Sequence, residues 1–422
     1  MRSRVSLLFT AIVFVSLLLS ASQPRSSASH PPHGYGQVIA RDEHGASTTG
    51  SVPNSPTPIC TLGWHIETVD SVGNVGLYSS LALDTAGHPH IGYRDQDNQD
   101  IKYAYHDGTT WIIGTVDSAG DLGTWNSLDV DSFGRPHMSY INSIPYADDL
   151  KYAHFVGAGG NCGPANDWEC YLVDSDGFLG GYSSLKLDTS DLPHVSYYDP
   201  GNTALKYASY VGSGGNCGPS NDWQCDTVDD SGQMGEATSL ALDSAGRPHI
   251  TYYQHVIADL RYAYYDGVTW HLETVDSAGN VGTDSSLALD TSDRPHISYF
   301  DYANRNLKYA YHDGTTWHIQ TVDSVGDVGG ESSLAVDSAN RPHIAYNDAT
   351  NGTLEHAWYD GTLWHFETVD SGGVGDASLS LDASGRASIS YSYGNGDLKY
   401  AYQCCRVYLP LFSANPFGRL AK

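Results

Sequence analysis

Four short sequence markers each recur seven times along the chain, and together they predict an all-β fold, a seven-bladed β-propeller with four antiparallel strands per blade. The first marker is a tryptophan, repeated at intervals of 47 to 57 residues from Trp64 to Trp364. The other three are typified by SSLALD at 79–84, RPHISY at 294–299 and LKYAY at 307–311. A period of this length with four strand-like runs is typical of a propeller blade.

Each marker has the alternation and the composition of a β-strand. In LKYAY, Leu307 and Tyr309 face one side of the strand and Lys308 faces the other, which is a period of two residues. The turns between markers contain Asp and Gly, as at 243–248 and 313–316. These residues supply the dihedral angles and local hydrogen bonds of tight hairpins, so the markers are expected to be joined as hairpins.

The phase of the repeats predicts how the ring closes. The repeats begin on the tryptophan strand at Trp64 and end after 398–402, so the last blade has only three strands of its own. We therefore expect the N-terminal strand to join the last blade as its outermost strand. This pairing would bring Cys60 beside Cys404 or Cys405 and predicts a disulfide across the seam, with the remaining cysteine free or intermolecular.

Four further cysteines lie in the two longest repeats. Cys162 and Cys170 are eight residues apart, as are Cys217 and Cys225, in the parallel contexts NCGPANDWEC and NCGPSNDWQC. Two copies of one spacing predict two hairpin disulfides, Cys162–Cys170 and Cys217–Cys225. Zinc is the alternative, but neither copy is accompanied by a matching second pair of ligands.

The first residues have the features of an export signal. Arg2 and Arg4 precede an apolar run at 5–19 and small residues at 20–22, and the run is shorter than the roughly 20 residues of a membrane-spanning helix. We therefore predict a secreted protein, extracellular or at the cell surface, without membrane insertion. The predicted organisation is a signal peptide at 1–22, a disordered Ser/Pro/Gly-rich leader at 23–59, the propeller at 60–405 and a C-terminal tail at 406–422.

The charge balance excludes one class of partner. Lys and Arg number 21 and Asp and Glu 49, which gives a net charge of −28. Such a chain repels phosphate backbones, so nucleic acid is not an expected partner. Much of the acidity comes from the same turn aspartates repeated in every blade, and it therefore does not identify a ligand. We expect a monomer.

The run LKYAYHDGTTWHIQTVDS at 307–324 resembles the blades of bacterial and fungal propeller lectins. It is also similar to the Asp-box turn of sialidase-type propellers, and Asp107, Gly108 and Trp111 match that turn in kind with one intervening residue fewer. The resemblance covers 64–402 and implies a secreted bacterial seven-bladed repeat propeller. The shared motif is a structural turn, so it says more about fold than about function.

A histidine and an arginine recur at equivalent positions of most blades, and each could be interpreted as a functional group. Their repetition argues against that interpretation. Because every blade would repeat the same local geometry, we interpret them as parts of buried hydrogen-bond networks and not as a metal ring or a ligand site. The histidines of the third marker are His90, His137, His194, His249, His296 and His343. The arginines of the preceding turn are Arg135, Arg247, Arg294, Arg341 and Arg386.

Differences between blades concentrate in two loops that strand alternation places on one face, around the channel mouth. The position entering the inner strand is occupied in successive blades by Tyr78, Trp125, Tyr182, Ala237, Asp284, Glu331 and Ala377. The loop after the third marker adds Arg94, Tyr198 and Tyr302. Aromatic rings beside carboxylates suit the apolar faces and hydroxyl edges of sugars, so we predict a lectin-like glycan site here. A scaffold for protein contacts is the alternative.

An enzyme is the less favoured interpretation, and no catalytic residue is assigned. The chain has no nucleophile elbow, P-loop or dinucleotide fingerprint. A sialidase-like glycoside hydrolase would need groups that break the repeat, which are Arg94, Arg305, Glu236, Glu331 and Glu355. No cofactor is expected. Calcium at 95–100 or 174–177 is an alternative, although neither run matches the twelve-residue calcium loop.

Overall fold

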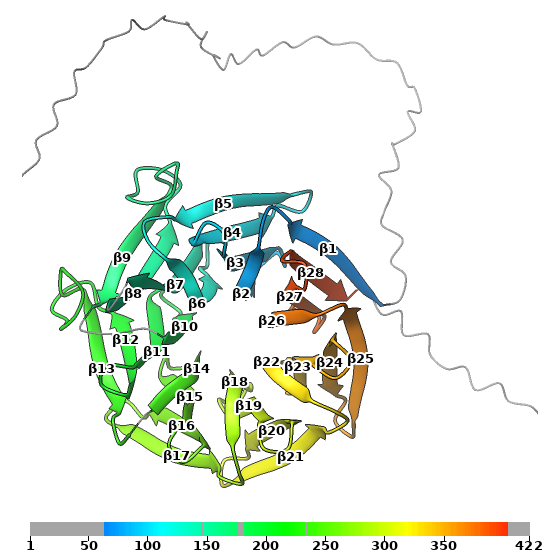
Figure 1. The fold of residues 1–422 in the computed structure, drawn as a ribbon. Coiled ribbons are helices and arrows are strands. Elements are labelled where there is room, and N and C mark those ends of the chain that lie inside the picture. The colour runs from blue at the N-terminus through cyan, green and yellow to red at the C-terminus, as the bar shows by residue number, and fades with distance from the viewer. Residues whose placement is uncertain (1–62, 145–146, 176–180, 233, 404–422) are drawn as a thin grey trace, which may run out of the picture. The chain divides into compact units, whose positions relative to one another are not determined.

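The computed structural model describes residues 63–144, 147–175, 181–232 and 234–403, and every regular element in these ranges is a β-strand. Its 28 strands form seven four-stranded antiparallel sheets, which stand as blades around a common central axis (Figure 1). The predicted fold class is confirmed. Within the described ranges there is no helix, and hence none long and apolar enough to cross a membrane.

The blades follow one another along the chain, and each runs from the channel to the rim. Blade 1 contains β2 (Val75–Leu83), β3 (Pro89–Asp95), β4 (Asp100–His106) and β5 (Trp111–Asp117). Blade 2 contains β6 (Leu122–Val130), β7 (Pro136–Ile144), β8 (Ala147–Phe155) and β9 (Trp168–Asp174). Blade 3 contains β10 (Gly181–Leu187), β11 (Pro193–Asp199), β12 (Ala204–Tyr210) and β13 (Trp223–Asp229).

The later blades repeat the same plan. Blade 4 contains β14 (Met234–Leu242), β15 (Pro248–Gln254), β16 (Asp259–Tyr265) and β17 (Trp270–Asp276). Blade 5 contains β18 (Val281–Leu289), β19 (Pro295–Asp301), β20 (Asn306–His312) and β21 (Trp317–Asp323). Blade 6 contains β22 (Val328–Val336), β23 (Pro342–Asp348), β24 (Thr353–Tyr359) and β25 (Trp364–Ser371). Blade 7 contains β26 (Val374–Leu381), β27 (Ala387–Tyr393), β28 (Leu398–Gln403) and β1 (Trp64–Asp70).

Blade 7 is closed by the N-terminal strand, as the phase of the repeats predicts. Strand β1 pairs antiparallel with β28, with Trp64 opposite Gln403 and Thr68 opposite Lys399. The predicted seam disulfide of Cys60 with Cys404 or Cys405 lies outside the described residues and stays a prediction. The signal peptide, the leader and the tail also lie outside them.

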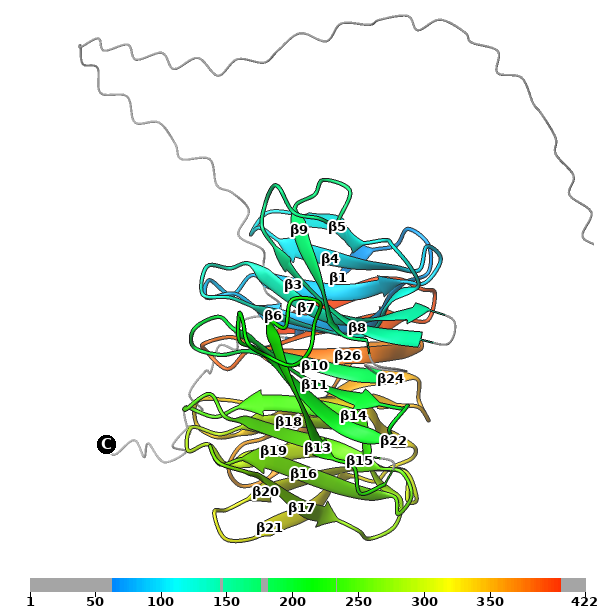
Figure 2. The ribbon, with the colours of Figure 1, turned by 90° about the vertical axis from the view of Figure 1, so that its left-hand side faces the viewer.

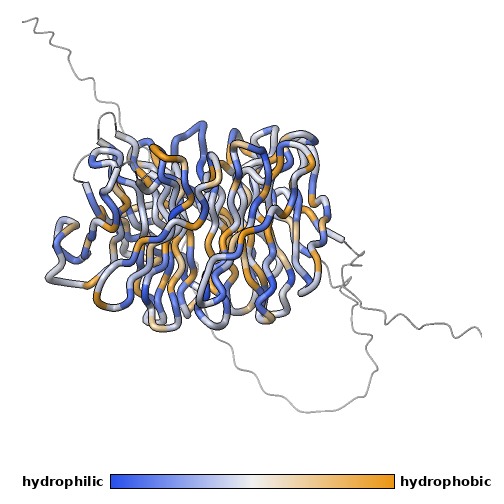
Figure 3. Tube along the Cα trace, turned by 90° about the horizontal axis from the view of Figure 1, so that it is seen from below, coloured by the Kyte–Doolittle hydropathy of each residue, from blue (hydrophilic) through white to orange (hydrophobic). Residues whose placement is uncertain are grey.

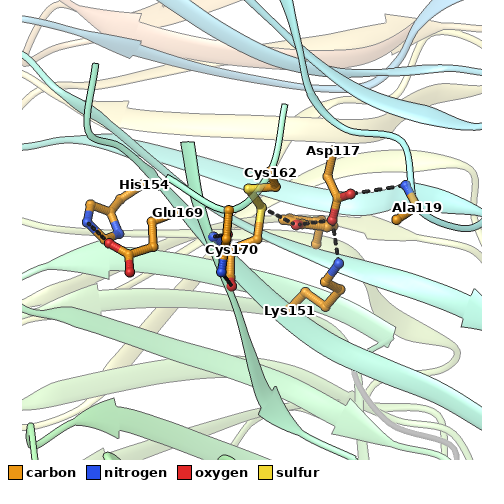
Figure 4. The surroundings of a disulfide bond; sticks show 9 residues. Asp117, Ala119, Lys151, His154, Cys162, Glu169 and Cys170 are labelled. Atoms are coloured by element: carbon orange, nitrogen blue, oxygen red, sulfur yellow. Dashed lines mark hydrogen bonds and ion pairs between the residues drawn. A yellow bond between two sulfur atoms is a disulfide. The ribbon is translucent and has the colours of Figure 1, made fainter. Parts of the chain in front are cut away.

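Two hairpin disulfides are present, Cys162–Cys170 and Cys217–Cys225, each with a Cα–Cα distance of 5.9 Å. Both predictions are confirmed. In the first hairpin, the Asn161 side chain accepts a hydrogen bond from the Cys170 backbone N–H (2.7 Å) and donates one to the Cys170 carbonyl (3.0 Å). Figure 4 shows this disulfide next to the ion pair of Asp117 and Lys151.

The hydrophobic core is divided into seven clusters, and each lies between two adjacent blades. Figure 2 shows the blades from the side, and in Figure 3 hydrophobic and hydrophilic segments alternate through the disc. At every blade interface the tryptophan of the outer strand contacts an aromatic ring of the preceding blade edge-on. An example is Trp168 on Tyr103, at 5.4 Å between ring centroids. In blade 7 the partner of Trp64 is His356.

Each blade interface also contains a buried Tyr–Asp hydrogen bond. The hydroxyl of the tyrosine that ends the third marker donates to the aspartate that ends the outer strand of the preceding blade, as Tyr299 does to Asp276 (2.7 Å). The same bond occurs at all seven interfaces. In five of them a lysine, such as Lys308, pairs with the same carboxylate. Arg261 takes the lysine's place in blade 4, and Glu355 takes it in blade 6.

A closed ring of serines links the seven inner strands. In every blade, one serine hydroxyl oxygen accepts the backbone N–H of a leucine in the next blade, at 2.9 to 3.0 Å. The serines are Ser80, Ser127, Ser184, Ser239, Ser286, Ser333 and Ser378. Because Ser378 bonds to Leu81, the ring of hydrogen bonds continues across the seam.

One serine of this ring can be removed to measure its contribution. In Ser286→Ala the N–H of Leu334, a buried residue, loses its acceptor, and we expect the free energy of unfolding to fall by about 1–2 kcal/mol. Denaturant unfolding followed by tryptophan fluorescence would measure the change. The matched control is Ser292→Ala, at an exposed turn position. Equal unfolding midpoints for the two variants would contradict the proposed role of the ring.

Candidate ligand-binding site at the channel mouth

The inner strand of every blade begins with a backbone bulge that turns one side chain toward the channel. At each bulge one non-glycine residue has a positive φ, between 46° and 56°. These seven residues are Tyr78, Trp125, Tyr182, Ala237, Asp284, Glu331 and Asp376. With the residues that follow them, they line a cavity of about 320 Å³. Because all seven inner strands contribute to its wall, the cavity lies on the axis of the propeller.

Three adjacent blades give this cavity an aromatic wall. Tyr78 lies 5.8 Å from Trp125 between ring centroids, and Trp125 lies 4.9 Å from Tyr182. The three rings are half-buried, so part of each remains accessible from the cavity. The tyrosine hydroxyls and the indole N–H form no hydrogen bond with other described residues. They are therefore available to a ligand.

The opposite wall consists of three carboxylates, Asp284, Glu331 and Asp376. The Glu331 side chain accepts the N–H of Asp376 (2.6 Å) and an amide N–H of Asn347 (2.6 Å). Asp376 accepts a hydrogen bond from the Ser392 hydroxyl (3.3 Å). These bonds hold Glu331 and Asp376 at the edge of the cavity.

The channel raises the pKa of all three acids. Desolvation by the surrounding walls is the main cause for Glu331, repulsion by Asp376 and Asp284 adds to it, and together they raise its pKa to about 7. Desolvation also raises the pKa of Asp284 and of Asp376. Asp284 and Glu331 are nevertheless exposed, so the effect comes from the protein that surrounds the cavity and not from complete burial of the two side chains.

The position of blade 7 in the bulge ring corrects the sequence-based assignment. Counting along the repeat places Ala377 at this position, whereas the structure places Asp376 there, with a φ of 51°. The reason is that β26 has eight residues while β2 and β22, for example, have nine. Val374 and Gly375 correspond to the first two residues of β2 and β22, but one residue fewer separates them from the bulge. The bulge of blade 7 therefore lies at 376 and not at 377. The correction adds a third carboxylate to the site.

A groove continues from the central cavity over the seam. Its volume is about 410 Å³, and Asp376 lines both the groove and the central cavity. Other lining residues are Asn74, Ser392, Tyr393 and four glycines of blade 7. Since glycines contribute no side chains, part of the groove wall consists of backbone. An elongated ligand could leave the centre in this direction.

The other predicted ligand residues lie outside the central cavity. Arg94 is 3% exposed and pairs with Asp121 at 2.6 Å, so its charge is already neutralised within the fold. Tyr198 is buried opposite Gly181 in the sheet of blade 3. Tyr302 is 49% exposed and packs on the guanidinium of Arg305 at 4.4 Å. The structure thus brings together five of the eight predicted residues and leaves these three apart.

The repeated histidines and arginines have structural partners, as their repetition predicts. In five blades the histidine Nδ1 bonds to the tyrosine hydroxyl of the neighbouring strand, and in blade 6 His343 contacts His356 instead. Each repeated arginine forms an ion pair with the aspartate four residues before it. In Arg294 and Asp290, for example, this bond closes the turn between β18 and β19.

The first of the two runs considered for calcium, 95–100, contains a turn that recurs in other blades, and the second, 174–177, lies partly outside the described residues. Asp95 accepts the N–H and the side-chain amide of Asn98, and the same turn recurs at Asp301 and Asn304. Asp174 accepts hydrogen bonds from Tyr197 and from a lysine, Lys206. Within the described ranges, no group of three or more His, Cys, Asp or Glu residues is arranged to hold a metal ion.

Comparisons with known proteins identify the fold and no family. No protein-family model and no curated protein matches the chain. The YCF48 structure from Cyanidioschyzon merolae superimposes with a TM-score of 0.51 at 12% identity, over 80% of this chain and 98% of the other. The Cps50 (Swd1) β-propeller domain from Myceliophteria thermophila does so with a TM-score of 0.50 at 11% identity, over 80% and 99%.

A third similar structure is an α-L-arabinofuranosidase from Fusarium graminearum. Its TM-score is 0.43 at 12% identity, over 78% of this chain and 93% of the other, which is too distant to support an argument. At these identities the comparisons support the propeller fold alone. The ligand must therefore be argued from the channel mouth itself.

Proposed function

We propose that this protein is a glycan-binding module whose ligand site is the central cavity. The observation that carries the proposal is the division of one cavity between an aromatic wall, Tyr78, Trp125 and Tyr182, and a carboxylate wall. A sugar ring has an apolar face that packs on an aromatic ring and hydroxyl edges that donate to carboxylates. The walls face each other across the space that such a ring would occupy.

The size and outlet of the site support a sugar chain as the ligand. The central cavity has the volume of a small-molecule site, and the groove that begins at Asp376 leads outward from it. One unit would lie in the cavity and the following units in the groove. The two hairpin disulfides fit the proposed extracellular location, because such bonds persist in oxidising compartments.

Trp125→Ala should weaken glycan binding by about tenfold or more. Trp125 is the central ring of the aromatic wall, and its loss removes the largest apolar surface in the cavity. A glycan array would identify ligands, and isothermal titration calorimetry would then compare the affinities of the variant and the unmodified protein. The matched control is Phe133→Ala, which removes a ring that is 79% exposed on the turn at the far end of β6. Equal losses in both variants, or none in Trp125→Ala, would refute the proposed site.

The alternatives lead to different outcomes in the same experiments. Glu331 with a pKa of about 7, beside two further carboxylates, has the properties of a general acid in glycoside hydrolysis. Release of shortened products during incubation with a bound glycan would favour a hydrolase over a binding module. A protein scaffold would bind no glycan on the array. In that case neither the unmodified protein nor Trp125→Ala would bind a glycan, and the two would not differ in this experiment.

A further inference from the structure

Within the described part of the chain, no lysine or arginine forms an ion pair with the carboxylates of the channel mouth, whereas several acids elsewhere in the fold have such a partner. Asp117 is paired with Lys151 between blades, and Asp290 is paired with Arg294 in a turn. No lysine or arginine is among the residues that line the central cavity. Arg94 lowers the pKa of Tyr78 from outside the cavity, but its guanidinium is already paired with Asp121.

This arrangement keeps three negative groups close together at a cost that a ligand could relieve. Glu331 accepts the backbone N–H of Asp376, and Asp376 accepts the Ser392 hydroxyl, so these two carboxylates are held side by side. Desolvation by the surrounding walls disfavours the ionised form of all three acids, and repulsion by Asp376 and Asp284 adds to it at Glu331. A positive group placed between them would gain charge-assisted hydrogen bonds and would remove the repulsion at the same time.

The facing aromatic wall selects the kind of cation. A metal ion would use the oxygens and leave Tyr78, Trp125 and Tyr182 without a role, and the described residues hold no metal-binding cluster. An organic ammonium attached to an apolar ring uses both walls, since aromatic faces also attract cations. On a glycan, the group with this chemistry is the free amine of an amino sugar.

We propose that the central cavity recognises a glycan with an unacetylated amino group, whose ammonium lies against Asp284, Glu331 and Asp376 while its ring packs on Trp125. This inference rests on the proposed glycan-binding function and specifies its ligand class. It predicts proton release on binding, because the ammonium favours the ionised form of Glu331. At about pH 6.5 an amine with the pKa of a peptide α-amino group, about 7.7–8.0, is mostly protonated, whereas Glu331 is not fully ionised.

The test compares a β-1,4-linked glucosamine hexamer with its fully N-acetylated form by isothermal titration calorimetry. We expect the glucosamine hexamer to bind about tenfold tighter or more, and repetition in buffers of different ionisation enthalpy should show proton release. In Glu331→Gln, whose amide can keep the bonds from Asn347 and Asp376, the preference and the proton release should both be lost.

A control separates this site from general attraction to an acidic protein. Glu169→Gln removes one carboxylate from the outer strand β9, and both variants change the net charge of −28 by one. General attraction would therefore be weakened equally by the two substitutions, a result that overturns the inference. Equal or tighter binding of the N-acetylated hexamer also overturns it and leaves glycan binding intact. If neither hexamer binds, the inference fails, and the proposed function fails with it only when neutral glycans are not bound either.

Discussion

Replacement of Asp276 by alanine is expected to lower the free energy of unfolding by about 3–5 kcal/mol. Asp276 is 5% exposed and accepts hydrogen bonds from Tyr299 of the next blade and from Lys308, which is itself 9% exposed. Without the carboxylate, a buried ammonium and a buried hydroxyl lose their partner at the interface of blades 4 and 5. Burial alone would raise the pKa of Asp276, but the bonds from Lys308 and Tyr299 lower it overall, which shows that the interface favours the charged form.

Denaturant unfolding of the oxidised protein would measure this loss. The control is Asp230→Ala, which removes an exposed aspartate next to the equivalent position of blade 3, and we expect its unfolding midpoint to be unchanged. The double variant Asp276→Leu with Lys308→Met should recover part of the stability, because it leaves no unpaired charge. An Asp276→Ala midpoint close to that of Asp230→Ala would show that the Tyr–Asp–Lys group contributes little.

Gly329→Ala is expected to cost several kcal/mol for a different reason. Gly329 has a φ of +103°, and a Cβ at this position would lie 2.6 Å from the Cα and 2.8 Å from the backbone N of Leu307 in blade 5. The added Cβ would clash with the main chain of Leu307 and is itself attached to the main chain of β22. The clash can therefore be relieved only if β20 and β22 shift against each other. The positive φ adds a strain of about 1–3 kcal/mol.

The contribution of the close approach can be separated from that of the dihedral angle. Gly314 has a φ of +97°, and a Cβ there would have no atom within 4 Å. Gly314→Ala therefore carries the dihedral cost alone, and its midpoint should lie between those of the unmodified protein and Gly329→Ala. If the two variants lost the same stability, the contact between blades 5 and 6 would not be limiting at this point.

The repeats were sufficient to predict the fold because each blade is a local unit with its own turns. The markers give the number of blades, the number of strands and the closing role of β1 without knowledge of any long-range contact. The Tyr–Asp bonds between blades were not predicted. A signal for them exists, since six of the seven pairs are separated by 23 residues, as in Asp276 and Tyr299. Only the structure shows that this constant spacing is a contact between neighbouring blades.

The site was harder to predict because it depends on deviations from the repeat. Tyr78, Trp125 and Glu331 could be found by comparing equivalent positions, but the shorter β26 displaced the seventh position and concealed Asp376. Arg94 was predicted as a ligand group because it is charged and not repeated. Its pairing with Asp121, 27 residues away, depends on the packing of blade 1 against blade 2 and leaves no local signature.

The seam has a consequence for the order in which the chain acquires its structure during synthesis. Strand β1 is made before every other strand of the ring, yet its partner β28 is made last. Blades 1 to 6 can form from consecutive segments as they emerge, whereas β1 must remain without a sheet until the last blade appears. Its exposed strand edge is vulnerable to incorrect pairing throughout that interval. The pairing that closes the ring is therefore the one between the strands most distant in the sequence, and contacts of this kind are expected to form late in folding.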